Sequence, residues 1–181
     1  MKPQGFALFD SPIGPCAVAW NKNGIAGMQL TAGTVGKTRA HAAKRWPSAV
    51  EAPPPPGVQR ALERVLSLLS GAKDDLADLP LDLEDAPDFQ RKVWDVARAV
   101  PPGQTITYGE IGKRLGVGPE RAREIGQAMG SNPIPIIVPC HRVLAASGKM
   151  GGFSAPGGVA TKRRMLEIEG AAAVGAGPLF G

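Results

Sequence analysis

The chain has 181 residues, 43% of them hydrophobic and 20% charged, with a formal net charge of +5. This is the composition of a globular protein that can bury a core, as one ordinary domain or two small ones. No stretch approaches the ~20 apolar residues of a membrane span, and residues 1–14 lack the blocks of a signal peptide. The two cysteines, Cys16 and Cys140, have no spacing typical of a disulfide framework or a metal site. We therefore expect a reducing, intracellular compartment, the cytoplasm. We also expect a monomer.

The positive charge is concentrated in one stretch. Between residues 98 and 164, ten Lys and Arg residues stand against three acids, so the rest of the chain is slightly acidic. Such a basic stretch is typical of a protein that binds nucleic acid, although an ordinary solvated surface can carry the same number of charges.

Residues 1–82 predict a small α/β domain. Three short apolar runs indicate strands at 6–9, 16–20 and 25–30, and residues 21–24 have the chemistry of a hairpin turn. A helix is expected over 35–46, followed by a stiff extended spacer of prolines at 53–56. Apolar residues at helical spacing then indicate a second helix, and they are Leu62, Val65, Leu66 and Leu69. No motif in residues 1–82 indicates a catalytic site.

A second unit begins around Leu83 and is predicted to extend to residue 170. Asp88 is expected to cap a helix whose buried face carries Phe89, Val93, Ala97 and Val100. Residues 101–103 end it, and two short helices follow at 108–115 and 119–129, joined by a glycine turn. This pattern is typical of a helix-turn-helix, although many helical hairpins bind nothing.

The second helix of this pair has a distinctive surface. Ala122, Ile125 and Met129 are expected to face inward, whereas Arg123 and Gln127 share another face. Gly126, Ala128 and Gly130 add little side-chain bulk, so the helix could approach a DNA groove closely. Residues 171–181, rich in Ala and Gly, are expected to form a flexible tail.

Cys140 lies between that helix and an expected hairpin. Three prolines in residues 133–139 predict an extended, rigid approach to it. A free cysteine is commonly a small core residue, but His141 and Arg142 follow directly, and a nearby cation or base favours the reactive thiolate. An acid to orient His141 must come from elsewhere, and Glu167 and Glu169 are available. Cys-His pairs also occur in hydrolases.

Residues 139–143, Pro-Cys-His-Arg-Val, resemble the active-site signature of the O6-alkylguanine-DNA alkyltransferases. The resemblance extends from about residue 89 to 170 in the order and spacing of its motifs, whereas residues 1–82 are similar only in size and layout. The matching motifs lie at 89–94, 102–105, 108–111, 123–133, 151–153, 157–158, 162 and 169–170.

This resemblance implies an α+β fold with a small N-terminal RNase H-like α/β domain and a C-terminal winged-helix domain. It also implies a single-turnover methylated-DNA–protein-cysteine methyltransferase that repairs O6-alkylguanine, and possibly O4-alkylthymine, in double-stranded DNA. The damaged base is flipped out of the stack, because its alkyl carbon cannot be attacked in line while the base is stacked. No cofactor and no metal take part.

The resemblance also assigns roles to individual residues. Cys140 is the alkyl acceptor, His141 its water-mediated base, Glu169 the acid orienting His141, and Tyr108 the proton donor to guanine. On the DNA side, Arg123 fills the vacated stack, and its helix contributes Gln127, Ala122 and Met129. The pocket and its support comprise Asn132 in the turn, Lys162 in the last helix, Arg142, the carbonyls near Cys140 and Val143, Phe153 and Ser154.

Three features depart from the family pattern. Phe153 stands where many members have tyrosine, residues 155–156 are inserted before Gly157, and residues 119–121 are one residue longer than usual. These departures bear on substrate range and binding strength. Two other readings are an alkyltransferase-like protein that binds lesions without chemistry, which lacks the cysteine, and a Cys-His hydrolase, which needs turnover and an oxyanion hole.

Overall fold

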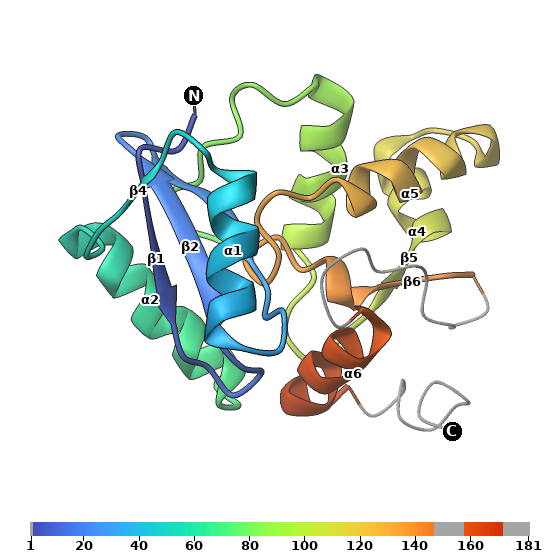
Figure 1. Cartoon of the computed structure of the whole chain (residues 1–181). Coiled ribbons are helices and arrows are strands. Elements are labelled where there is room, and N and C mark those ends of the chain that lie inside the picture. Colours follow the sequence, from blue (N-terminus) through green and yellow to red (C-terminus); the bar gives the residue numbers. More distant parts are fainter. Residues whose placement is uncertain (1, 147–157, 172–181) are drawn as a thin grey trace.

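The computed structural model describes residues 2–146 and 158–171. Its N-terminal part contains a four-stranded sheet in the order β3-β2-β1-β4 (Figure 1). The strands are β1 (Gly5–Phe9), β2 (Cys16–Asn21), β3 (Gly24–Gln29) and β4 (Val50–Glu51). β2 pairs antiparallel with both β1 and β3, and β4 joins β1 in parallel. The three predicted strands and the hairpin turn between β2 and β3 are confirmed.

Two helices cover opposite faces of this sheet. Helix α1 (Val35–Arg45) packs with its following Trp46 against Phe6, Ala17 and Ala19 (Figure 1). Helix α2 (Pro56–Leu69) lies on the other face, where Ala7, Val18 and Trp20 belong to the main core. Neighbouring residues of β1 and β2 thus pack alternately against α1 and in the main core, because successive side chains of a strand point to opposite faces of the sheet.

Two predicted helix starts are wrong by a residue or more. Pro56, expected in the extended spacer, is the first residue of α2, where a missing N–H costs nothing because the first turn has no partner for it. Asp88 was expected as a cap, but Pro87 occupies the cap position and Asp88 is the first helical residue. Its carboxylate pairs with Arg91 within the first turn instead.

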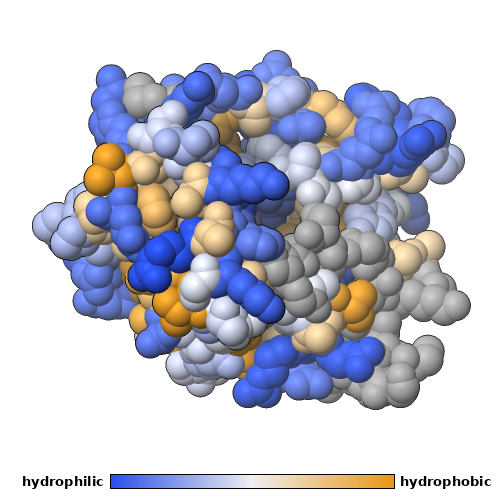
Figure 2. Space-filling model, viewed as in Figure 1, coloured by the Kyte–Doolittle hydropathy of each residue, from blue (hydrophilic) through white to orange (hydrophobic). Residues whose placement is uncertain are grey.

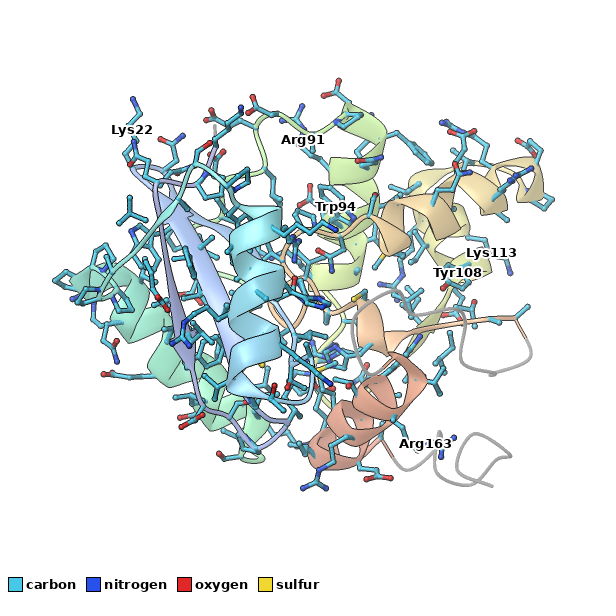
Figure 3. The ribbon with its side chains drawn as sticks, in the orientation of Figure 1. Lys22, Arg91, Trp94, Tyr108, Lys113 and Arg163 are labelled. Carbon is cyan, nitrogen blue, oxygen red and sulfur yellow. The ribbon has the colours of Figure 1, made fainter. Side chains whose placement is uncertain are left out.

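The C-terminal part is mainly helical. It contains α3 (Asp88–Arg98), α4 (Tyr108–Leu115), α5 (Ala122–Gly130) and α6 (Gly158–Glu169). Strand β6 (Val143–Leu144), just after Cys140, pairs in parallel with β5 (Ile106–Thr107). Up to residue 146, this parallel pair stands where the sequence predicted a hairpin. Trp94 points from α3 toward α5 and donates from Nε1 to the Ala128 carbonyl at 2.8 Å (Figure 3).

The helix pair is present, with a shorter second helix than expected. Gly116, in the left-handed conformation with φ 71°, ends α4. Residues 119–121 form a 3-10 turn before α5 starts at Ala122. Ala122 was expected to face inward, but it is exposed, and the buried face consists of Ile125, Ala128 and Met129. The 3-10 turn changes the helical phase at this junction, which explains the error.

One cluster of buried apolar side chains runs through both parts, from Ala7 of β1 to Met165 of α6. The segment between α2 and α3 is tied down by arginines: Arg64 pairs with Asp74 and Asp78, and Arg98 donates to three carbonyls of residues 76–79. The fold is therefore α+β, with no helix in the described ranges long and apolar enough to cross a membrane.

Candidate active site

The segment before Cys140 is a compact turn, so the expected extended approach is wrong. Residues 133–138 form successive bends and turns, and the Ile134 carbonyl accepts from the Val138 N–H at 2.9 Å. Ile136 has a φ of 76°, a conformation that a branched side chain rarely adopts. A proline fixes its own φ but not that of the residue after it, so Ile136, which follows Pro135, is free to reverse the chain. The turn therefore stores backbone strain beside Cys140.

Asn132 holds this turn from inside. Its side-chain oxygen accepts from the Ile134 N–H at 3.0 Å, and its Nδ2 donates to the Val138 carbonyl at 2.8 Å. The same side chain is a hydrogen-bond partner of the Cys140 sulfur. Cys140 starts a 3-10 turn and is only 7% exposed. The fold thus brings the amide and the thiol together across seven intervening residues.

His141, Arg142 and Glu169 form a buried charged network. The Nε2 of His141 lies 2.7 Å from Oε1 of Glu169. Arg142 grips the same carboxylate from Nε, 2.9 Å from Oε2, and from Nη2, 2.8 Å from Oε1. Its Nη1 donates to the Val100 carbonyl at 2.8 Å. Glu167, the other candidate acid, is exposed and faces Arg164, so Glu169 is the acid in contact with His141.

This network sets the state of the imidazole. A carboxylate only accepts hydrogen bonds, so Nε2 carries the proton and Nδ1 is bare. That Nδ1 is buried and has no hydrogen-bond partner within the described part of the chain. Burial lowers the pKa of His141 more than Glu169 raises it, so the ring is neutral at neutral pH. Burial alone would raise the pKa of Glu169, but His141 and Arg142 bring it down to about 2.

The cation that acts on the pKa of the Cys140 sulfur is Lys162 of α6. Burial raises the pKa of Cys140, and the Asn132 side chain and the Lys162 charge oppose that rise. The sequence assigned the basic setting to His141 and Arg142, which is wrong because their hydrogen bonds go to Glu169. Lys162 is 1% exposed, and its Nζ donates to the Val143 carbonyl at 2.8 Å. That carbonyl, expected to contact guanine, therefore already has one donor.

Tyr108 is the first residue of α4 and is half-buried. Burial raises the pKa of its hydroxyl, and the charge on Cys140 raises it further, so the phenol lies near the sulfur and stays protonated at neutral pH. Thr107 caps α4 by accepting from the Glu110 N–H at 3.1 Å, which fixes where the helix starts and so where Tyr108 points.

The α5 surface presents some of the residues expected to face DNA. Arg123 and Gln127 are exposed on α5, and the low-bulk residues beside them leave the helix open to a partner. Hydrophilic residues gather over the region of α5 and the turn before it (Figure 2). Met129 is 6% exposed and packs in the core, and Ala122 offers only a methyl group. Of the four expected contacts, Arg123 and Gln127 have the reach and the exposure for DNA.

The basic stretch is less exposed than its charge count indicates. Arg142 and Lys162 are buried, and Arg121 pairs with Glu124 while lying 3.8 Å above the Phe89 ring. Lys113 of α4 extends outward, and Arg163 lies on α6 (Figure 3). Two of the ten basic residues thus belong to the buried site, whereas Lys113, Arg114, Arg123 and Arg164 are exposed where a polyanion could reach them.

Some sequence expectations fall on other parts of the chain. Phe153, Ser154 and the inserted residues 155–156 lie outside the described residues. Cys16 is buried in β2, where burial raises its pKa to about 11 against a hydrogen bond from Ser11. Within residues 2–146 and 158–171, no group of His, Cys, Asp and Glu side chains is arranged to hold a metal ion. Ala171, placed in the expected tail, is buried and bonds from its N–H to the Leu166 carbonyl.

Comparison with known proteins gives consistent matches. Residues 88–171 match the family described as 6-O-methylguanine DNA methyltransferase, DNA binding domain. Proteins named methylated-DNA–protein-cysteine methyltransferase are 37% identical in Mycobacterium bovis, covering 91% of both chains, and 34% identical in Methanosarcina acetivorans, covering 91% of this chain and 97% of the relative.

Solved structures agree with these sequence matches. The Mycobacterium tuberculosis O6-methylguanine methyltransferase is 35% identical with a TM-score of 0.69, covering 92% of this chain and 93% of the other. The Mycobacterium tuberculosis OGT in complex with DNA is 33% identical with a TM-score of 0.70, covering 98% and 99%. The similarity includes the part N-terminal to residue 83, which the sequence related to known proteins only by size and layout.

Proposed function

The chain belongs to the family of methylated-DNA–protein-cysteine methyltransferases, and from this premise we propose that it repairs O6-alkylguanine in double-stranded DNA by transferring the alkyl group to its own Cys140. The observation that carries the proposal is the buried Cys140 thiol beside an oriented, neutral His141 and the Lys162 ammonium. This arrangement supplies a nucleophile, a base and an electrostatic partner for the thiolate.

The transfer is a single displacement. The Cys140 sulfur forms a bond to the alkyl carbon while the bond between that carbon and guanine O6 breaks. The thiol proton passes through an intervening water to Nδ1 of His141, whose ring Glu169 and Arg142 hold in place. Tyr108 donates a proton to the departing guanine. In the net reaction, one proton moves from the Cys140 thiol to the guanine. The thioether has no route back, and each molecule acts once.

DNA recognition follows from the surface of α5. This helix enters the minor groove, Arg123 takes the place of the flipped guanine in the stack, and Gln127 contacts the DNA beside it. Arg123 suits this role because it is long, cationic and exposed on a helix with little competing bulk. The flipped base lies against Cys140 and Val143, with Asn132 and Lys162 supporting the site; Phe153 and Ser154, outside the described residues, are further candidates for contact with it.

The same premise subdivides the fold. Residues 1–82 form an RNase H-like domain, residues 83–170 form the winged-helix catalytic domain, and a short tail follows. The protein acts as a cytoplasmic monomer, and O4-alkylthymine is a second substrate to be tested. The pairing of β5 with β6 beside the helix pair supports a compact winged-helix unit.

Intact mass spectrometry tests the reaction directly. After exposure to a duplex containing O6-methylguanine, the protein is expected to gain one methyl group, located by peptide mapping on Cys140, with at most one equivalent transferred. The matched control is Cys16→Ser, which removes the other cysteine and should leave the transfer intact. An adduct on Cys16, or continuous turnover, would contradict the proposal.

The same spectrum separates the two alternatives. A lesion-binding protein without chemistry would bind the duplex but keep its mass. A Cys-His hydrolase would show turnover without a stable adduct and no preference for DNA. The presence of Cys140 argues against the first, and the exposed basic residues near α5 argue against the second.

A further inference from the structure

Arg45 reaches from the N-terminal part of the fold to the segment that carries the active site. It is the last residue of α1, and its guanidinium forms a cation–π contact with Trp46, 5.3 Å from the ring centroid. Its Nη2 donates to the Pro133 carbonyl at 2.9 Å, and its Nη1 donates to the Met28 carbonyl at 2.7 Å. Figure 1 shows the segment after α5 passing beside α1.

The Pro133 carbonyl is held twice. Besides the bond from Arg45, it accepts from the backbone N–H of Met28 in β3 at 3.0 Å. One carbonyl of the turn is therefore fastened to both the edge strand and the adjacent helix of the N-terminal sheet. A hydrogen bond from a charged donor is stronger than one between neutral groups, so Arg45 supplies the firmer of the two.

Pro133 lies next to the residue that contacts the sulfur. Asn132 directly precedes it and is a hydrogen-bond partner of Cys140, while also donating to the Val138 carbonyl. The turn between them contains Ile136 with its φ of 76°. A strained backbone persists only where its surroundings hold it, and the two hydrogen bonds to the Pro133 carbonyl are such a constraint.

We propose that Arg45 is a positioning residue for alkyl transfer: by holding the Pro133 carbonyl, it keeps the strained turn closed so that Asn132 stays on the Cys140 sulfur. The inference rests on the proposed function and adds to it a part for the N-terminal domain. The guanidinium of Arg45 donates to residues 28, 29 and 133, so we infer that it acts through the backbone of residues 132–139.

The consequence for reactivity is specific. When the turn opens, Cys140 loses a partner that favours its thiolate, so its apparent pKa rises. The other groups that interact with the sulfur are the backbone of His141 in the same 3-10 turn, Tyr108 of α4 and Lys162 of α6. The hydrogen bonds of Arg45 go instead to residues 28, 29 and 133. A change at Arg45 should therefore alter the rate and its pH profile while the binding of DNA to α5 is kept.

The test measures single-turnover rate constants of the full-length protein against pH, with O6-benzylguanine as the free base and with an O6-methylguanine duplex. Arg45→Met is expected to slow both substrates by the same factor, about tenfold. Its half-maximal pH should move upward. Arg45→Lys, which keeps a charged donor, should recover part of the rate.

Two matched controls separate positioning from folding. Arg39→Met removes the same charge from α1, where the Arg39 guanidinium pairs with exposed Glu51 at the surface. Leu62→Ala removes a buried side chain of α2, on the opposite face of the sheet from α1, and so lowers stability without removing a hydrogen bond to the Pro133 carbonyl. Both should keep the wild-type rate and pH profile at a temperature well below their melting points.

Each result has a definite meaning. If Arg45→Met reacts like the wild type, or if Leu62→Ala slows the reaction and shifts its pH profile equally, Arg45 is not a positioning residue, although alkyl transfer stands. If the wild type itself transfers no alkyl group, the proposed function fails instead. A rate loss confined to the duplex would also overturn the inference, because a positioned sulfur must serve both substrates.

Discussion

Replacing Glu169 with Gln removes the charge at the centre of the buried network while keeping the shape of the side chain. The pKa of Glu169 falls from an ordinary 4.5 to about 2 in the folded protein. This difference corresponds to about 3 kcal/mol of stabilisation at neutral pH. The loss of one partner of a buried ion pair also costs about 3–5 kcal/mol, since Arg142 would remain buried without its carboxylate. Two independent routes thus give a similar magnitude.

The dependence on pH distinguishes this electrostatic term from lost packing. Because the folded-state pKa of Glu169 lies below the unfolded one, its stabilisation is complete above about pH 4.5 and is lost as the pH falls toward 2. Between about pH 7 and pH 3, the wild type should lose about 2 kcal/mol more unfolding free energy than Glu169→Gln. His141, whose pKa is also lowered by burial, adds an acid loss of its own in both proteins.

Urea unfolding at a series of pH values measures this difference. Glu167→Gln is the matched control, because Glu167 lies on the same helix but is exposed, with Arg164 3.8 Å away. Its unfolding free energy should stay close to that of the wild type at every pH. The reasoning is refuted if Glu169→Gln and the wild type lose stability in parallel on acidification, or if Glu167→Gln is the more destabilised variant.

Three further predictions concern the reaction. Arg123→Ala should slow repair of a duplex far more than reaction with a free alkylated base, which needs no flipping, and equal slowing in rate assays would exclude the role in the stack. Lys162→Met should raise the apparent pKa of Cys140 in thiol titrations, whereas exposed Arg164→Met should not; unchanged titration of Lys162→Met would contradict the electrostatic assignment. Phe153 lacks the hydroxyl of a tyrosine, and a hydrogen bond of that kind is worth about two- to tenfold in rate. Because phenylalanine offers only apolar contact, we expect O6-benzylguanine to react at least as well as O6-methylguanine when the two compete in the same duplex context. A strong methyl preference unchanged by Phe153→Tyr would show that this residue does not set substrate range.

The sequence predicted the elements whose patterns are local. The strands predicted from short apolar runs and the helices predicted from apolar residues at helical spacing are confirmed to within a few residues, because both patterns reflect burial against neighbouring elements. The errors occur where neighbours in space override the local rule. The 3-10 turn at residues 119–121 moved Ala122 to the surface, and a reversal at Ile136 replaced the extended approach to Cys140.

The residues that support the reactive centre were harder to predict. The motif around Cys140 identified the family, but the part played by Arg142 depends on Glu169, twenty-seven positions away, meeting it through two hydrogen bonds. Arg45 gave no signal at all, because its partner is a backbone carbonyl eighty-eight positions along the chain. Contacts to backbone carbonyls leave no pattern in the side-chain sequence, so only the fold reveals them.

The arrangement of buried charge explains how one small site holds an anion and a base together. Glu169 lies between Arg142 and His141, so the carboxylate is neutralised by the guanidinium and the imidazole remains uncharged. Lys162 lies outside this network and acts on Cys140. If Arg142 instead faced the sulfur, Glu169 would draw a proton onto His141 and the ring could no longer accept one from the thiol. Separate partners for the carboxylate and the sulfur therefore keep His141 uncharged and able to accept a proton, as the proposed transfer requires.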